Sequence, residues 1–166
     1  MDIISHGLWG GIAFGRKRRS LFWWSFGFGV MPDLFSFGIF TGMVQLGMAS
    51  GPDWGNGLPD PAAIPQYIHA LYNVTHSLII FSAVFGLVWL LRKKPFLPLL
   101  AWGLHILVDI PTHSTAFFPT PFLWPVSDFS INGINWSRPI ILYPELILLS
   151  LFYFVWWLSR RKKKPE

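Results

Sequence analysis

Positively charged residues gather in three short runs along this chain, and long apolar stretches separate the runs. Twelve of the thirteen lysines and arginines lie in residues 16–19, 92–94 and 160–164. A membrane crossing needs about 20 apolar residues, and lysine and arginine collect where crossings end on the cytoplasmic side. The pattern therefore predicts a membrane protein whose three basic ends share the cytoplasmic face.

The composition favours the same environment. Only 13% of the residues are charged, whereas 52% are hydrophobic. A soluble domain carries about 25% charged residues, so this chain cannot cover a water-facing surface. We assign the net charge of +5 to contacts with anionic membrane lipids rather than nucleic acid, because a folded polar face is missing. The absence of cysteine excludes disulfides and thiolate metal ligands.

The apolar stretches predict an all-α, polytopic membrane bundle in a single domain, residues 1–166. Four full transmembrane helices are expected, at residues 21–43, 64–91, 95–111 and 139–159. The stretch 3–15 is short and is expected to form a partly inserted N-terminal helix. Alternating directions place the N-terminus outside a cell (inner) membrane and the C-terminus in the cytoplasm. Residues 44–63 and 112–138 then form extracytoplasmic loops, the second an aromatic cap at the outer interface.

Six ionisable residues share one predicted depth. Each lies ten to sixteen residues from its nearest basic run, or roughly 15–24 Å along a helix that rises about 1.5 Å per residue. An ionisable side chain that faces lipid at the bilayer centre costs about 2.5–3.5 kcal/mol. We therefore expect the six to share an interior site. They are His6, Asp33, His76, His105, Asp109 and Glu145.

A metal ion is the expected occupant of this site, with a structural polar network and a water-filled proton path as alternatives. His105 and Asp109 are four residues apart, so they lie on one helix face. His113 follows four residues later, beyond a bend expected at Pro111. Asp33 follows a proline, where a helix break would turn its carboxylate inward. Imidazoles and carboxylates without cysteine suit one or two Zn²⁺ ions, and also admit Mn²⁺ or Fe²⁺.

Four further polar residues are expected to lie outside the site. His69 falls near the outer end of its span and is expected to be an exposed interfacial residue. Asp53, Asp60 and Asp128 occur among turn-forming residues of the two outer loops, and we expect their carboxylates to be solvated.

The candidate ligands also occur in short motifs that, in this order, resemble the predicted membrane-bound metal-dependent hydrolases. That family includes an SOS-inducible bacterial branch and is distantly similar to zinc-dependent phospholipase C. The motifs are His6-Gly, Pro32-Asp33, Thr75-His76-Ser77, His105-Ile-Leu-Val-Asp109 and Leu123-Trp124-Pro125.

The resemblance implies a metal site and assigns its ligands. Asp109 is the implied bridge between two ions, and His113 and Glu145 stand in for further ligands of the phospholipases. Phe35 and Leu71 occupy positions where relatives carry an aspartate and a histidine. The implied ligands are His6, Asp33, His76, His105 and Asp109.

Together these features predict a metal-dependent hydrolase that acts on a phosphoester of a lipid or lipid-linked substrate in the outer half of the bilayer. Asp33 or Glu145 is the expected general base. One alternative is a haem protein with His76 and His105 as axial ligands. Another is a cation or proton transporter that uses the same intramembrane carboxylates. The sequence leaves the oligomeric state open.

Overall fold

The computed structural model describes residues 1–52 and 60–161, which form helices and connecting loops without any strand. The all-α prediction is confirmed for this part of the chain. Asp53, the rest of residues 53–59 and the basic residues 162–164 lie outside the described residues.

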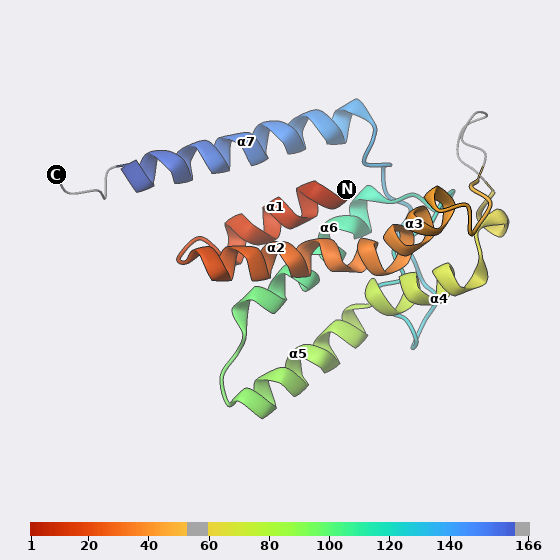
Figure 1. Ribbon diagram of the computed structural model, residues 1–166, viewed down its shortest axis with the longest axis horizontal. Coiled ribbons are helices and arrows are strands. Elements are labelled where there is room, and N and C mark those ends of the chain that lie inside the picture. The colour runs from red at the N-terminus through yellow and green to blue at the C-terminus, as the bar shows by residue number, and fades with distance from the viewer. Residues whose placement is uncertain (53–59, 162–166) are drawn as a thin grey trace.

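The centre of the molecule is a helical hairpin formed by α1 (Ile3–Phe14) and α2 (Arg19–Asp33), with α6 (Leu100–Thr112) packed against both (Figure 1). Small residues let α1 and α2 approach closely. A Cβ atom placed on Gly29 would lie 2.5 Å from the carbonyl oxygen of His6, and one on Gly10 would lie 2.6 Å from that of Ser25. Larger residues at these two glycines would push the helices apart.

The helix that begins with α2 continues without a break to Gln45. After Asp33 it passes through a π-helical turn, η1 (Leu34–Gly38), and ends as α3 (Ile39–Gln45). Pro32 lacks an N–H group, so the carbonyl one turn earlier loses its helical hydrogen bond, and the π-turn begins two residues after this proline. The hydroxyl of Ser36 donates to the Pro32 carbonyl at 2.9 Å. The helix changes its pitch after Asp33 instead of ending, so the expected break is wrong, whereas the expected inward turn of the Asp33 carboxylate is confirmed.

The span predicted over residues 64–91 is a pair of helices bent by 54°. A short 3-10 turn, η2 (Pro61–Ala63), leads into α4 (Gln66–Thr75), and α5 (Leu78–Arg92) follows the bend. Ser77 caps α5 by accepting hydrogen bonds from the amides of Ile79 and Ile80. Its hydroxyl also donates to the Trp124 carbonyl, which ties the aromatic loop to the bend.

Within residues 1–52 and 60–161, two helices are long and apolar enough to cross a membrane: the continuous helix Arg19–Gln45 and α7 (Pro139–Arg161). The bent pair α4–α5 makes a third if it forms one span. The remaining predicted span, residues 95–111, is shorter than these helices. It comprises the 3-10 turn η3 (Leu97–Leu99) and α6. Length and composition thus support two or three of the four predicted full spans.

The connections that carry basic residues lie toward one end of the molecule, at the left in Figure 1. This end includes the α1–α2 turn, the α5–α6 connection and the C-terminal end of α7. The Arg160 guanidinium donates to the carbonyl of Arg16 at 2.9 Å, which joins two of the basic runs directly. The described residues of the three basic runs therefore lie toward one end, as the sequence predicts.

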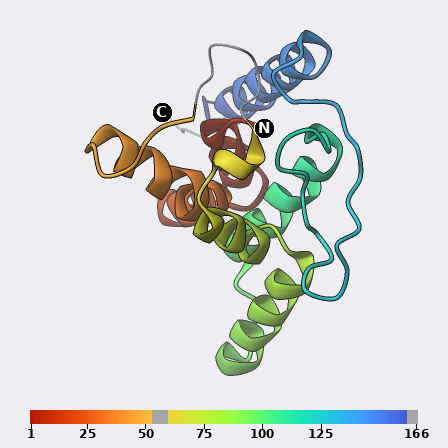
Figure 2. The ribbon, with the colours of Figure 1, turned by 90° about the vertical axis from the view of Figure 1, so that its right-hand side faces the viewer.

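The opposite end holds α3, α4 and the loop 112–138 (Figures 1 and 2). Phe118 from the loop is buried in one cluster with Phe40, Ile68 and Tyr72. The loop is thus fixed to the bundle by its aromatic side chains.

Candidate metal centre

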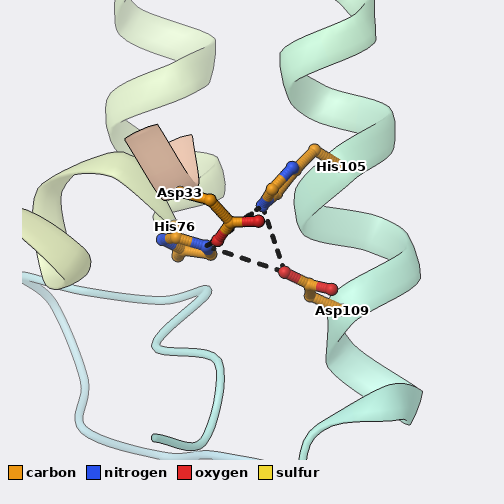
Figure 3. A group of neighbouring side chains, drawn as sticks. All are labelled: Asp33, His76, His105 and Asp109. Atoms are coloured by element: carbon orange, nitrogen blue, oxygen red, sulfur yellow. Dashed lines mark hydrogen bonds and ion pairs between the residues drawn. The ribbon is translucent and has the colours of Figure 1, made fainter. Parts of the chain in front are cut away.

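Four of the predicted site residues converge between the helices (Figure 3). Asp33 comes from the end of α2, His76 from the bend between α4 and α5, and His105 and Asp109 from one face of α6. One ligand atom of each lies within 4.8 Å of the others. The helical spacing of His105 and Asp109 places both on one side, and the other two side chains come from distant segments of the chain.

The distances within this group fit a metal ion. The Nε2 atoms of His76 and His105 are 3.1 Å apart. The Asp109 Oδ2 atom lies 3.1 Å from His105 Nε2 and 3.6 Å from His76 Nε2, while Asp33 Oδ1 lies 3.8 and 3.4 Å from them. A tetrahedral zinc site with bonds of about 2.0–2.1 Å separates its ligand atoms by about 3.3–3.4 Å. The observed distances bracket that value.

Backbone carbonyls determine which nitrogen of each imidazole faces the group. His105 Nδ1 lies 2.7 Å from the Gly29 carbonyl oxygen, and His76 Nδ1 lies 3.1 Å from that of Tyr72. A carbonyl can only accept a hydrogen bond, so each Nδ1 carries the proton. Both Nε2 lone pairs then face each other, and they repel unless a proton or a metal cation lies between them. In metal sites, a carbonyl that accepts from the other ring nitrogen orients a metal-binding histidine in the same way.

Burial of these side chains increases the need for a proton or a cation between them. The side chains of His76, His105 and Asp109 are at most 1% exposed, and that of Asp33 is 14% exposed. The Asp109 Oδ2 atom accepts no hydrogen bond among the described residues as long as His105 Nε2, 3.1 Å away, carries a lone pair. A buried carboxylate oxygen without a partner is costly. A bound cation would satisfy it together with the two imidazoles.

The second oxygen of Asp109, Oδ1, faces a different set of nitrogen atoms. His6 Nε2 and the Met1 amino group each lie 2.9 Å from it, and His113 Nδ1 lies 3.4 Å away. The His6 ring stacks on His105 with ring centres 3.7 Å apart. Burial holds the pKa of His113 below its ordinary value, although the Asp109 carboxylate opposes this shift. His6 and His113, both predicted ligands, therefore lie outside the four-residue group and contact the Oδ1 atom of Asp109 instead.

Glu145, the other predicted general base, also lies outside the four-residue group. It is buried on α7, and neither of its carboxylate oxygens has a hydrogen-bond partner among the described residues. Asp33 belongs to the group, so the two residues proposed for the same role have different surroundings.

Two supporting residues escaped sequence reasoning. The Tyr72 ring stacks on His76 with ring centres 3.8 Å apart, and the Gly29 carbonyl accepts from His105. The available signal for Gly29 is its position one helical turn before Asp33. The signal for Tyr72 is the same spacing before His76, although an aromatic residue in an apolar helix points first to ordinary packing.

No protein-family model matches this chain, and no curated protein or solved structure does so either. Membership of the hydrolase family therefore stays a prediction from the ordered motifs, and the candidate metal centre rests on the geometry above.

Proposed function

We propose that this protein is a membrane-embedded, metal-dependent hydrolase whose centre is formed by Asp33, His76, His105 and Asp109. The observation that carries the proposal is the convergence of two imidazole lone pairs and two carboxylates in a buried site. Without a cation these electron-rich atoms would repel one another in a medium that screens charge poorly. The set lacks sulfur and suits Zn²⁺, with Mn²⁺ or Fe²⁺ as other occupants.

A cavity of about 590 Å³ beside the group supports a lipid or lipid-linked substrate. Asp33 and His113 lie in its wall. Most of the other side chains in the wall are apolar, so a hydrocarbon chain would be well accommodated there. They are Ile3, Ile4, Phe37, Phe117, Phe118 and Trp136. A phosphoester at the end of such a chain would lie next to Asp33.

Each residue of the proposed centre has a separate role in the reaction. His76, His105 and Asp109 would hold a divalent cation, which would supply Lewis acidity and lower the pKa of water toward neutrality. Asp33, the most exposed member of the group, faces the cavity and accepts the proton from the attacking water. His76 and His105 are oriented by carbonyls and hold their Nε2 lone pairs toward the centre. The remaining candidate base, Glu145, keeps its carboxylate in a separate buried position on α7.

We further propose that Asp109 is able to bridge two ions. Its Oδ2 atom faces the four-residue group. Its Oδ1 atom faces His6 and His113, and a second ion there would take the place of the Met1 amino group, which lies 2.9 Å from this oxygen. Two cations on either side of one carboxylate clamp the attacking and leaving oxygens in many phosphoesterases.

The haem alternative fits the geometry poorly. Axial imidazoles on opposite sides of an iron place their Nε2 atoms about 4 Å apart, twice a metal–imidazole bond of about 2 Å. The two Nε2 atoms are 3.1 Å apart here, and two carboxylates occupy the space around them. A cation or proton transporter is separated from the hydrolase by the experiment below.

The membrane placement completes the proposal. We place all four predicted spans and α1 within the bilayer, with the basic end in the cytoplasm and the cavity toward the outer half. The shared position of the basic residues supports this orientation, since such residues favour the cytoplasmic side. The shorter helix α6 then lies within the bundle, packed against α1 and α2.

The test is metal analysis and phosphoesterase assay of the purified full chain and of His105→Ala. We expect bound transition metal and chelator-sensitive release of a phospholipid headgroup for the wild type, and loss of at least nine tenths of both for the variant. His69→Ala, a half-buried histidine outside the group, is the matched control and should keep its metal. Wild-type protein without metal refutes the centre. Metal without hydrolysis of any phosphoester refutes the enzyme, and a Soret band would establish haem.

A further inference from the structure

A second cavity, of about 360 Å³, lies between α4 and the loop 112–138. Tyr72 and Phe118 line both this cavity and the one beside Asp33, so the two cavities share part of a wall. The side chains that line the second cavity are more polar than those that line the cavity beside Asp33. The second cavity combines the aromatic rings of Tyr72, Phe118 and Trp124 with polar side chains.

One of these polar side chains is His69, which the sequence placed as an exposed interfacial residue. That expectation is wrong, because the ring is half-buried and stacks on Phe118 with ring centres 4.5 Å apart. Its Nε2 atom lies 3.1 Å from the Pro61 carbonyl oxygen and donates to it. The Nδ1 atom therefore carries a lone pair that can accept a hydrogen bond.

Asn73 and Asp128 also line the cavity. Within residues 1–52 and 60–161, neither side chain forms a hydrogen bond or an ion pair with another residue. The Asn73 amide offers two donors and an acceptor, and the Asp128 carboxylate offers acceptors. Their hydrogen-bonding capacity is thus available to a ligand that enters the cavity.

We propose that this cavity binds a neutral, polyhydroxylated group, such as one sugar ring or a polyol. The aromatic rings suit the C–H faces of such a ligand, and its hydroxyl groups can both donate to and accept from Asn73, Asp128 and His69. The volume lies near the lower end of small-molecule sites, about 300–1,000 Å³, which fits a single ring better than an oligosaccharide.

Charge and hydrogen bonding exclude two other classes of ligand. A phosphate or carboxylate would meet the Asp128 carboxylate without any lysine or arginine in the cavity wall. A quaternary ammonium group would suit the aromatic rings and Asp128. It would nevertheless leave the donors and acceptors of Asn73 and His69 without partners, which is unfavourable once water is displaced. The inference concerns binding and stands independently of the proposed hydrolysis.

The experiment is a ligand-observed saturation-transfer titration on the purified full chain. Sugar-based detergents would occupy the site, so the protein is kept in an amine-oxide detergent. The probes are methyl α-glucoside, myo-inositol and glycerol, with choline chloride for comparison. For a ligand of about twelve non-hydrogen atoms we expect saturable binding with a dissociation constant of about 1 mM.

Two variants localise the binding. Asn73→Ala and Asp128→Asn should each weaken binding of the hydroxylated probes at least fivefold. Gln66→Ala, at an exposed position on the same helix as Asn73, should leave it unchanged. Asp128 is exposed and its replacement is isosteric, so that variant keeps its fold. The proposal is overturned if none of the hydroxylated probes saturates, if choline binds as tightly as they do, or if both variants bind like the wild type.

Discussion

Replacing Gly29 by alanine tests whether the close contact of α1 and α2 builds the metal centre. The new Cβ atom would lie 2.5 Å from the His6 carbonyl oxygen, whereas ordinary contact begins at 3.4 Å. In a close-packed interior the two helices must therefore separate by about 0.9 Å. That shift exceeds the tolerance of about 0.5 Å within which a functional site keeps its geometry.

This separation of the helices should lower both the metal affinity and the stability of the Gly29→Ala variant. Gly29 supplies the carbonyl that orients His105, and His6 stacks on the same ring. Disturbing an outer-shell partner of this kind lowers metal affinity about 10- to 100-fold. The steric conflict costs about 1–3 kcal/mol, of which the better helix propensity of alanine returns about 1 kcal/mol. We therefore expect weaker metal binding together with a net loss of up to about 2 kcal/mol.

The assay measures metal affinity by competition with a chromogenic chelator, and stability by thermal unfolding in detergent. Gly27→Ala is the matched control, since a Cβ atom there meets nothing within 4 Å. It lies on the same helix and should keep the metal affinity of the wild type, while the better helix propensity of alanine should leave its Tm equal to that of the wild type or a few °C higher. Wild-type metal affinity in Gly29→Ala would show that the Gly29–His6 contact does not position the ligands, and would refute the reasoning.

Two further predictions concern the bend and the ion. Ser77→Ala removes the cap of α5 and the hydroxyl that donates to Trp124, so we expect a loss of about 1–2 kcal/mol, or about 2–8 °C in Tm. Ser159→Ala, at an exposed serine, is the control, and equal Tm values for the two variants would contradict the assignment. Stripping the protein with a chelator and returning Zn²⁺ at 100 times its dissociation constant should raise stability by about 2.7 kcal/mol. His105→Ala should lack that gain, and a wild type whose Tm does not respond would argue against a bound ion.

Local sequence rules anticipated some features of the fold well. The apolar stretches predict helices, and the helical period places His105 and Asp109 on one face of α6. The same rules mislead at one proline and hold at another. Pro32 sits in a helix that continues through a π-turn, whereas α6 ends one residue after Pro111 and His113 is extended. A missing N–H group shows where the hydrogen bonding changes, and the surrounding structure decides whether the helix bends, ends or continues.

The distance of each ionisable residue from its nearest basic run identified the residues of the candidate site but did not identify which of them contact one another. Six residues share a predicted depth, and four of the predicted ligands converge on one point. His6 approaches the far oxygen of Asp109, and Glu145 lies in a separate buried position. Depth specifies one coordinate, whereas convergence also requires that each helix present the right face.

The sequence by itself determined the all-α architecture, the apolar character of the helices and the set of ionisable residues that must find partners, because these follow from composition and periodicity along the chain. The tertiary structure decided which of those residues meet. That choice depends on how each helix is rotated about its axis, and close packing sets the rotation. The approach of Gly29 to His6 brings α1 and α2 together and aims the carbonyl that orients His105.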